Sequence, residues 1–73
     1  MLIYQLHTKR GYRFYKTYEG ANRAIEEDIL DIRGKIISDT RNGEEGKVVV
    51  EYDAYYNPAA KEVYEIKLVP LYE

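Results

Sequence analysis

The sequence predicts an α+β domain of the order ββαββ, in which one amphipathic helix packs on one face of a four- or five-stranded antiparallel sheet. Two observations lead to this fold class. Apolar residues recur every three or four positions between residues 18 and 32, which is the period of a helix with one buried face. Apolar and polar residues alternate in residues 2–8, 12–17, 47–56 and 62–69, which is the period of half-buried strands.

Residues 2–8 and 12–17 form the first predicted hairpin. A three-residue loop, Lys9-Arg10-Gly11, with its glycine in the left-handed conformation, is a common connection between antiparallel strands. This loop pairs Leu6 with Phe14 and gathers the apolar side chains on one face, whereas a two-residue loop would divide them between the two faces. The expected inner face consists of Leu2, Tyr4, Leu6, Tyr12 and Phe14.

Residues 18–32 form the predicted helix. Thr17 is suited to cap its amino end, and Gly34 is a stop signal at its carboxyl end. Ile36 extends the apolar stripe, so residues 35–39 either continue the helix or form a short strand. Because glycine inside a helix costs about 1 kcal/mol relative to alanine, we favour the stop at Gly34. The apolar stripe consists of Tyr18, Ala21, Ile25, Ile29 and Ile32.

Residues 47–56 and 62–69 are the strands of the second predicted hairpin, joined through residues 57–61. Pairing Tyr52 with Ile66 places the apolar side chains of both strands on one face. The helix is expected to lie on this face and on the apolar face of the first hairpin. Ile25 and Ile29 should then be buried against Leu6, Phe14, Val50, Tyr52, Ile66 and Leu68.

The length and composition limit what the chain can be. With 73 residues, the chain is expected to form a single domain over residues 1–73. It contains no cysteine, which excludes disulfides and thiolate metal sites. The first fifteen residues hold no continuous apolar run, and no stretch approaches the length of a membrane span. We therefore expect a cytoplasmic protein with no signal peptide and no membrane partner.

Residues that could carry catalysis are few. His7 is the only histidine and Ser38 the only serine, and nothing in the pattern brings the two together as a nucleophile and its base. No acidic pair, Asp28 with Asp31 included, has the histidine or cysteine partners or the loop pattern of a recognised metal site. The sequence therefore predicts a protein that is not an enzyme and has no catalytic residues, no metal and no cofactor.

The sheet face away from the predicted helix is expected to carry an unusual number of apolar side chains. A monomer of this size rarely leaves such a surface in water, and oligomerisation commonly supplements a small core. We therefore predict a protein-interaction module that forms a homodimer or another self-associated state, or binds another protein, through this face and its edge. Leu30 is a further exposed apolar residue on the helix. The predicted partner-binding residues are Ile3, Tyr15, Val49, Tyr55, Val63 and Val69.

A second hypothesis rests on residues 7–16, where bases and aromatic side chains are interleaved. Cations neutralise phosphates and rings stack on bases, so this pattern is typical of a nucleic-acid contact. Four bases and no acid stand before residue 18, but seven bases and thirteen acids follow, and this acidic remainder would repel a polyanion. Protein binding therefore remains the leading hypothesis. The candidate nucleic-acid contacts are Lys9, Arg10, Arg13, Tyr15 and Lys16.

The strand-to-helix step of residues 15–25 resembles that of many small bacterial and phage domains. A cysteine-free chain of this size also resembles phage or mobile-element accessory proteins, which often bind and block a host protein. This resemblance implies that the predicted interaction inhibits the partner.

Overall fold

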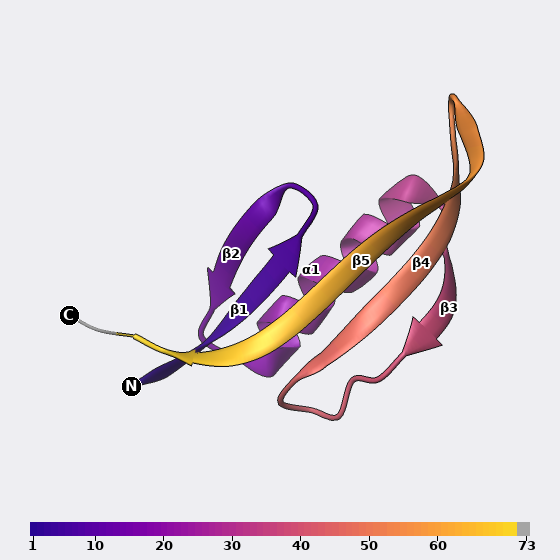
Figure 1. Cartoon of the computed structure of the whole chain (residues 1–73). Helices are drawn as coiled ribbons and strands as arrows, with labels where there is room; N and C mark the ends of the chain where they lie inside the picture. Colours follow the sequence, from indigo (N-terminus) through magenta and orange to yellow (C-terminus); the bar gives the residue numbers. More distant parts are fainter. Residues whose placement is uncertain (72–73) are drawn as a thin grey trace.

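The computed structural model describes residues 1–71, and in this part of the chain five antiparallel strands form one sheet with one helix across a face (Figure 1). The strand order across the sheet is β2-β1-β5-β4-β3, so the last strand lies at the centre. The predicted α+β architecture is confirmed, and residues 35–39 form a fifth strand rather than a continuation of the helix. The elements are β1 (Leu2–Thr8), β2 (Gly11–Tyr15), α1 (Tyr18–Ile32), β3 (Lys35–Asp39), β4 (Gly46–Ala54) and β5 (Asn57–Pro70).

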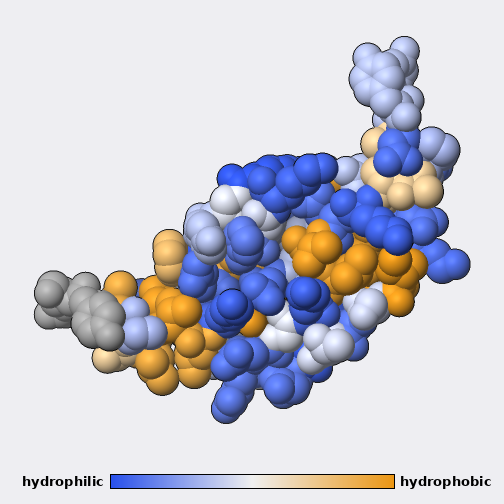
Figure 2. Space-filling view, in the orientation of Figure 1, coloured by the Kyte–Doolittle hydropathy of each residue, from blue (hydrophilic) through white to orange (hydrophobic). Residues whose placement is uncertain are grey.

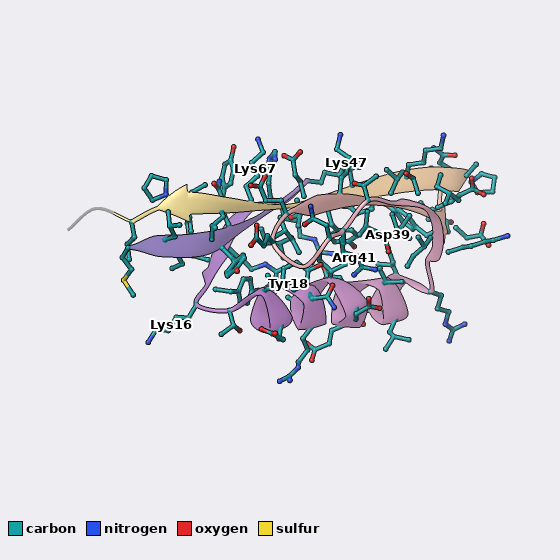
Figure 3. The ribbon with its side chains drawn as sticks, turned by 90° about the horizontal axis from the view of Figure 1, so that it is seen from below. Lys16, Tyr18, Asp39, Arg41, Lys47 and Lys67 are labelled. Carbon is teal, nitrogen blue, oxygen red and sulfur yellow. The ribbon has the colours of Figure 1, made fainter. Side chains whose placement is uncertain are left out.

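The molecule has two layers, the sheet and the helix, and the core lies between them (Figure 3). The apolar stripe of α1 packs on β1, β4 and β5, as the spacing predicts. One expectation about the core is corrected, because Phe14 is 57% exposed. Tyr64, at 1% exposure, is among the largest buried side chains. The buried apolar residues are Leu6, Ala21, Ile25, Ile29, Val48, Val50, Tyr64 and Ile66.

The helix begins at the predicted cap and ends in a Schellman motif. Thr17 Oγ1 accepts a hydrogen bond from the Gly20 N–H at 3.0 Å, which satisfies one of the free donors of the first turn. At the other end the Gly34 N–H donates to the Ile29 carbonyl at 2.9 Å. The left-handed residue of this motif is Arg33, with a φ of 55°, and not the glycine that follows it.

Gly34 is required for a different reason, which is the close approach of β4. A Cβ atom at this position would overlap Val50 Cγ1, a fully buried atom of the core. The glycine therefore permits the chain to leave the helix against the sheet, while Arg33 carries the cost of the left-handed conformation.

The first hairpin has a two-residue loop, Lys9-Arg10, and the predicted three-residue loop is wrong. Leu6 pairs with Arg13 instead of Phe14. A shift of one residue turns every side chain of a strand to the opposite face. Arg13 and Tyr15 therefore face the helix, whereas Tyr12 and Phe14 lie on the open face.

Contacts with α1, rather than burial, account for this register. Residues 12–14 are exposed in the observed register, so Tyr12 and Phe14 gain little from burial there. The observed register brings Arg13 Nη2 to 3.4 Å from Asp28 Oδ2 and packs Tyr15 against the core beside Gly20.

The second hairpin is also tighter than predicted, because only Tyr55 and Tyr56 join β4 to β5. Tyr52 pairs with Ala60 rather than Ile66, an offset of six residues along β5. Since six is an even number, each side chain keeps its predicted face and only its neighbour changes. The predicted turn at residues 57–61 is instead the first part of β5.

Truncation of the helical stripe tests the packing of α1 on the sheet. Ile25→Ala and Ile29→Ala should each lower the free energy of unfolding by about 2–5 kcal/mol, through lost transfer energy and a residual cavity. Glu27→Ala, on the exposed side of α1, should change it by no more than about 0.5 kcal/mol. Chemical denaturation measures all three variants. An Ile29→Ala protein as stable as Glu27→Ala would contradict the described core.

The carboxyl end of α1 leads to a second prediction, in which substitutions at two neighbouring residues change the free energy of unfolding in opposite directions. Gly34→Ala should lower the free energy of unfolding by about 1–3 kcal/mol, because the added methyl group overlaps Val50. Arg33→Gly should raise it by about 1 kcal/mol, because glycine adopts a positive φ without a Cβ penalty. Urea titration compares both variants with the parent. Effects of the same sign would show that the terminus is built differently.

Candidate binding surfaces

The described elements leave the sheet face away from α1 uncovered. Lys47 and Lys67 project from it on the side opposite the helix (Figure 3). The strand register brings charged side chains together there, with four lysines and two glutamates in neighbouring rows. These residues are Lys35, Lys47, Lys61, Lys67, Glu51 and Glu65. Asp53, two residues after Glu51 in β4, adds a third carboxylate to this face, so the open face has a small excess of lysine although the chain has a formal charge of −2.

Four of the predicted partner-binding residues lie on this open face as expected, in two separate pairs. Val49 lies opposite Val63 in β4 and β5, and Ile3 lies opposite Val69 in β1 and β5. Lys67 and Glu65 stand between the pairs along β5, with Lys67 Nζ 3.6 Å from Glu65 Oε1. Figure 2 views this face and shows two apolar areas separated by a polar band. The predicted continuous apolar face is therefore divided.

The other two predicted partner-binding residues lie elsewhere. Tyr15 faces the helix and packs against the core, so its assignment to the open face is wrong. Tyr55 lies in the β4–β5 turn next to Tyr56, and the two side chains are 93% and 92% exposed. Their rings meet edge to face, with centroids 4.6 Å apart. Tyr56 was not predicted as a contact, because its role depends on the two-residue turn.

The predicted nucleic-acid contacts of the first hairpin do not share one face. Lys9 and Arg10 form the turn, whereas Arg13 lies on the sheet face that carries the helix and pairs with Asp28 of α1. Lys16 follows β2 and points away from the sheet on the helix side (Figure 3). With Tyr15 also in contact with the core, the hairpin does not present the predicted row of bases and rings.

A hollow of about 420 Å³ lies on the open face where β1, β4 and β5 meet the first turn. Its wall includes His7, whose ring stacks on Tyr12 with centroids 4.5 Å apart and an interplanar angle of 13°. The basic lining consists of Lys9, Lys47 and Lys61. These residues are far apart in the sequence, and only the pairing of β5 with both β1 and β4 brings them together.

A polar cluster on the helix side is centred on Arg41. Its guanidinium binds Asp39 through two bonds, Nε to Oδ1 at 2.9 Å and Nη2 to Oδ2 at 2.6 Å. Nη1 donates to Glu26 Oε1 at 2.9 Å and to Asn22 Oδ1. Figure 3 shows Arg41 and Asp39 between the sheet and the helix. The cluster ties the loop after β3 to α1, and its donors and acceptors are matched, so we assign it a structural role.

A second set of polar residues beneath the helix surrounds Tyr64. Burial raises the pKa of Tyr64 to about 12, and the nearby carboxylates of Asp28 and Glu62 add to the shift. The phenol therefore keeps its proton at neutral pH and does not serve as a general base there.

Residues 1–71 contain no group of three histidine, cysteine, aspartate or glutamate side chains arranged to hold a metal ion. In the same range, α1 is neither long nor apolar enough to cross a membrane. Comparison with family models, curated proteins and solved structures finds no match for this chain.

The Arg41 cluster makes stability depend on pH. The hydrogen bond from Arg41 holds the pKa of Asp39 below its usual value, so the stabilisation is present above about pH 4 and is lost as the pH falls through the lowered pKa. Asp39→Asn should therefore lose less stability than the parent between about pH 5 and pH 2. The difference should be about 1 kcal/mol or less, because the Asp39 side chain is 35% exposed.

Urea denaturation at several pH values measures this effect. Arg41→Met removes the cation instead of the carboxylate, and it should flatten the acid profile in the same way. An Asp39→Asn protein with the full acid sensitivity of the parent would show that the pair does not couple to folding.

Proposed function

We propose that the chain is a non-enzymatic protein-interaction module whose main contact element is the β4–β5 hairpin. The observation that supports this proposal is the exposure of Tyr55 and Tyr56, 93% and 92%, at the tip of a hairpin that extends beyond the helix (Figure 1). Val49 and Val63 lie opposite each other on the outer face of the same hairpin, and the pair Glu51 and Lys61 lies between them and the tip.

Exposed tyrosine pairs are suited to binding. Each ring has a large apolar area and a hydroxyl that forms hydrogen bonds at a wet interface, and tyrosine is enriched among the residues that dominate binding energy. The edge-to-face contact between Tyr55 and Tyr56 holds both rings before binding, which reduces the entropy lost on association. The β4–β5 ladder fixes the tip relative to the core.

The shape of the tip favours a partner with a concave surface. A stable interface buries about 800 Å² on each partner, whereas one tyrosine buries about 150–250 Å². Two convex tips cannot reach that area together, but a groove that encloses the tip and the adjoining strands can. We therefore propose another protein, rather than a second copy of this chain, as the principal partner.

The proposal includes the consequence of binding. By occupying a groove, the hairpin blocks that surface of its partner, as in the phage accessory proteins that the chain resembles. The proposal places this interaction in the cytoplasm, in agreement with a chain that has no cysteine.

Site-specific photocrosslinking in the producing cell tests this proposal. A photoreactive phenylalanine analogue at position 55 should give a discrete crosslinked product, and the same analogue at Glu27, on the exposed helix side, should not. With the partner so obtained, Tyr55→Ala and Tyr56→Ala should each weaken binding by about 30-fold or more, the effect of a dominant interface residue.

Sedimentation velocity at tens of micromolar separates the two kinds of partner. A monomeric parent agrees with a different protein as partner, and a dimer that Tyr55→Ala abolishes would mean self-association through the tip. Identical products from positions 55 and 27, or none from either, would contradict the proposal.

A further inference from the structure

The two sides of the molecule differ in charge. The open sheet face carries four lysines against three carboxylates, those of Glu51, Asp53 and Glu65. The exposed side of α1 is acidic, with Glu19, Glu26, Glu27 and Asp31 against Arg23. An anion is therefore attracted to the sheet side and repelled from the helix side, although the net charge of the chain is negative.

The lysines of the hollow are available to a ligand. In the described part of the chain, no ion pair involves Lys9, Lys47 or Lys61. All three residues line the hollow, and they come from the first turn, β4 and β5. This arrangement is suited to a phosphate or another anion that several ammonium groups contact at once.

Aromatic side chains border the hollow on the side of β2. Tyr12 is 59% exposed and stacks on His7 of the hollow wall, and Phe14 is 57% exposed. Tyr12 and Phe14 are two residues apart on one strand face, which separates their Cα atoms by about 7 Å. We call His7, Tyr12 and Phe14 the ring shelf, because His7 lines the hollow and Tyr12 and Phe14 follow it on the same open face.

We propose that the open face binds single-stranded nucleic acid, with phosphates at Lys9, Lys47 and Lys61 and bases stacked on Tyr12 and Phe14. Strand-binding proteins combine these two features, a basic groove for the backbone and exposed rings for successive bases. This site goes beyond the proposed protein contact and uses neither Tyr55 nor Tyr56, although Val63 of the same hairpin also lines the hollow.

The exposed rings of Tyr12 and Phe14 distinguish a single strand from other anionic ligands. A duplex keeps its bases stacked inside, so it reaches the lysines but not the shelf. An acidic protein surface likewise uses the lysines and leaves Tyr12 and Phe14 in water. A single strand engages both, because its bases are free to leave their neighbours and stack on protein side chains.

Glu65 is the one carboxylate in the hollow wall, and it opposes an anion. Its Oε1 lies 3.6 Å from Lys67 Nζ, so a fourth lysine, at the edge of the site, offsets its charge. Three lysines without ion pairs in the same hollow then leave the site positive.

Fluorescence anisotropy with a labelled single strand of about 12 nucleotides, as DNA and as RNA, tests the proposal at about 50 mM salt. Tyr12→Ala and Phe14→Ala should each weaken binding by roughly 5- to 150-fold, the range for loss of one stacked base. Lys47→Gln and Lys61→Gln should each reduce the slope of log affinity against log salt by about 0.7. Since all four side chains are exposed, the variants should melt like the parent by circular dichroism.

Two controls match these changes. Lys16→Gln removes the same charge on the helix side and should leave affinity and salt slope unchanged. Tyr55→Ala removes an exposed ring at the hairpin tip and should also bind the strand like the parent, which separates this site from the proposed protein contact.

Absence of binding at tens of micromolar would overturn the proposal. So would unchanged affinity in both Tyr12→Ala and Phe14→Ala, or equal competition by a duplex or by a polyglutamate peptide of the same charge, because these outcomes would indicate a basic surface without a base-stacking shelf. A single strand that competes best and depends on both rings would support it.

Discussion

The packing of Ile25 and Ile29 on the centre of the sheet is the interaction on which the rest of the structure depends. A helix of 15 residues is about 22 Å long and 10 Å wide, and five strands span about 20 Å at a spacing of about 4.8 Å. One helix therefore covers the middle of one face. The buried apolar side chains of β1, β4 and β5 lie beneath it, while both edge strands and the whole of the other face remain in contact with water.

Polar contacts hold the two edges of the sheet to the same helix. At one edge, Arg13 of β2 reaches Asp28 of α1. At the other, Arg41 joins Asp39 of β3 to Glu26 of α1. Each edge thus uses a guanidinium with a carboxylate of the helix, a pairing that spans the gap where the apolar stripe does not reach. The helix therefore contacts the centre of the sheet through buried apolar side chains and the two edges of the sheet through ion pairs.

The uncovered surfaces have different chemical characters. The hairpin tip has two tyrosines and no charged side chain in the turn, whereas the hollow on the open face has lysines beside a stacked ring pair. The tip extends past the end of the helix (Figure 1), whereas the hollow is lined by residues of β1, the first turn, β4 and β5. The fold therefore presents two surfaces of different chemistry, and Val63 of β5 borders the hollow.

The sequence by itself determined the helix, its cap and its buried stripe, and the inner and outer alternation of β4 and β5, because these follow from periods of 3.6 and 2 along one segment. Only the tertiary structure decided which residues lie opposite one another. When β5 is shifted by an even number of residues, each of its side chains stays on the same face of the sheet. The alternation therefore cannot distinguish the observed pairing of Tyr52 with Ala60 from the predicted pairing with Ile66. In β2, residues 12–14 are exposed, so their burial does not fix which side chains face the helix. Contacts of Arg13 and Tyr15 with α1, which follows later in the chain, fix the register instead. The hollow and the ring shelf depend on both registers, which is why local periodicity could not reveal them.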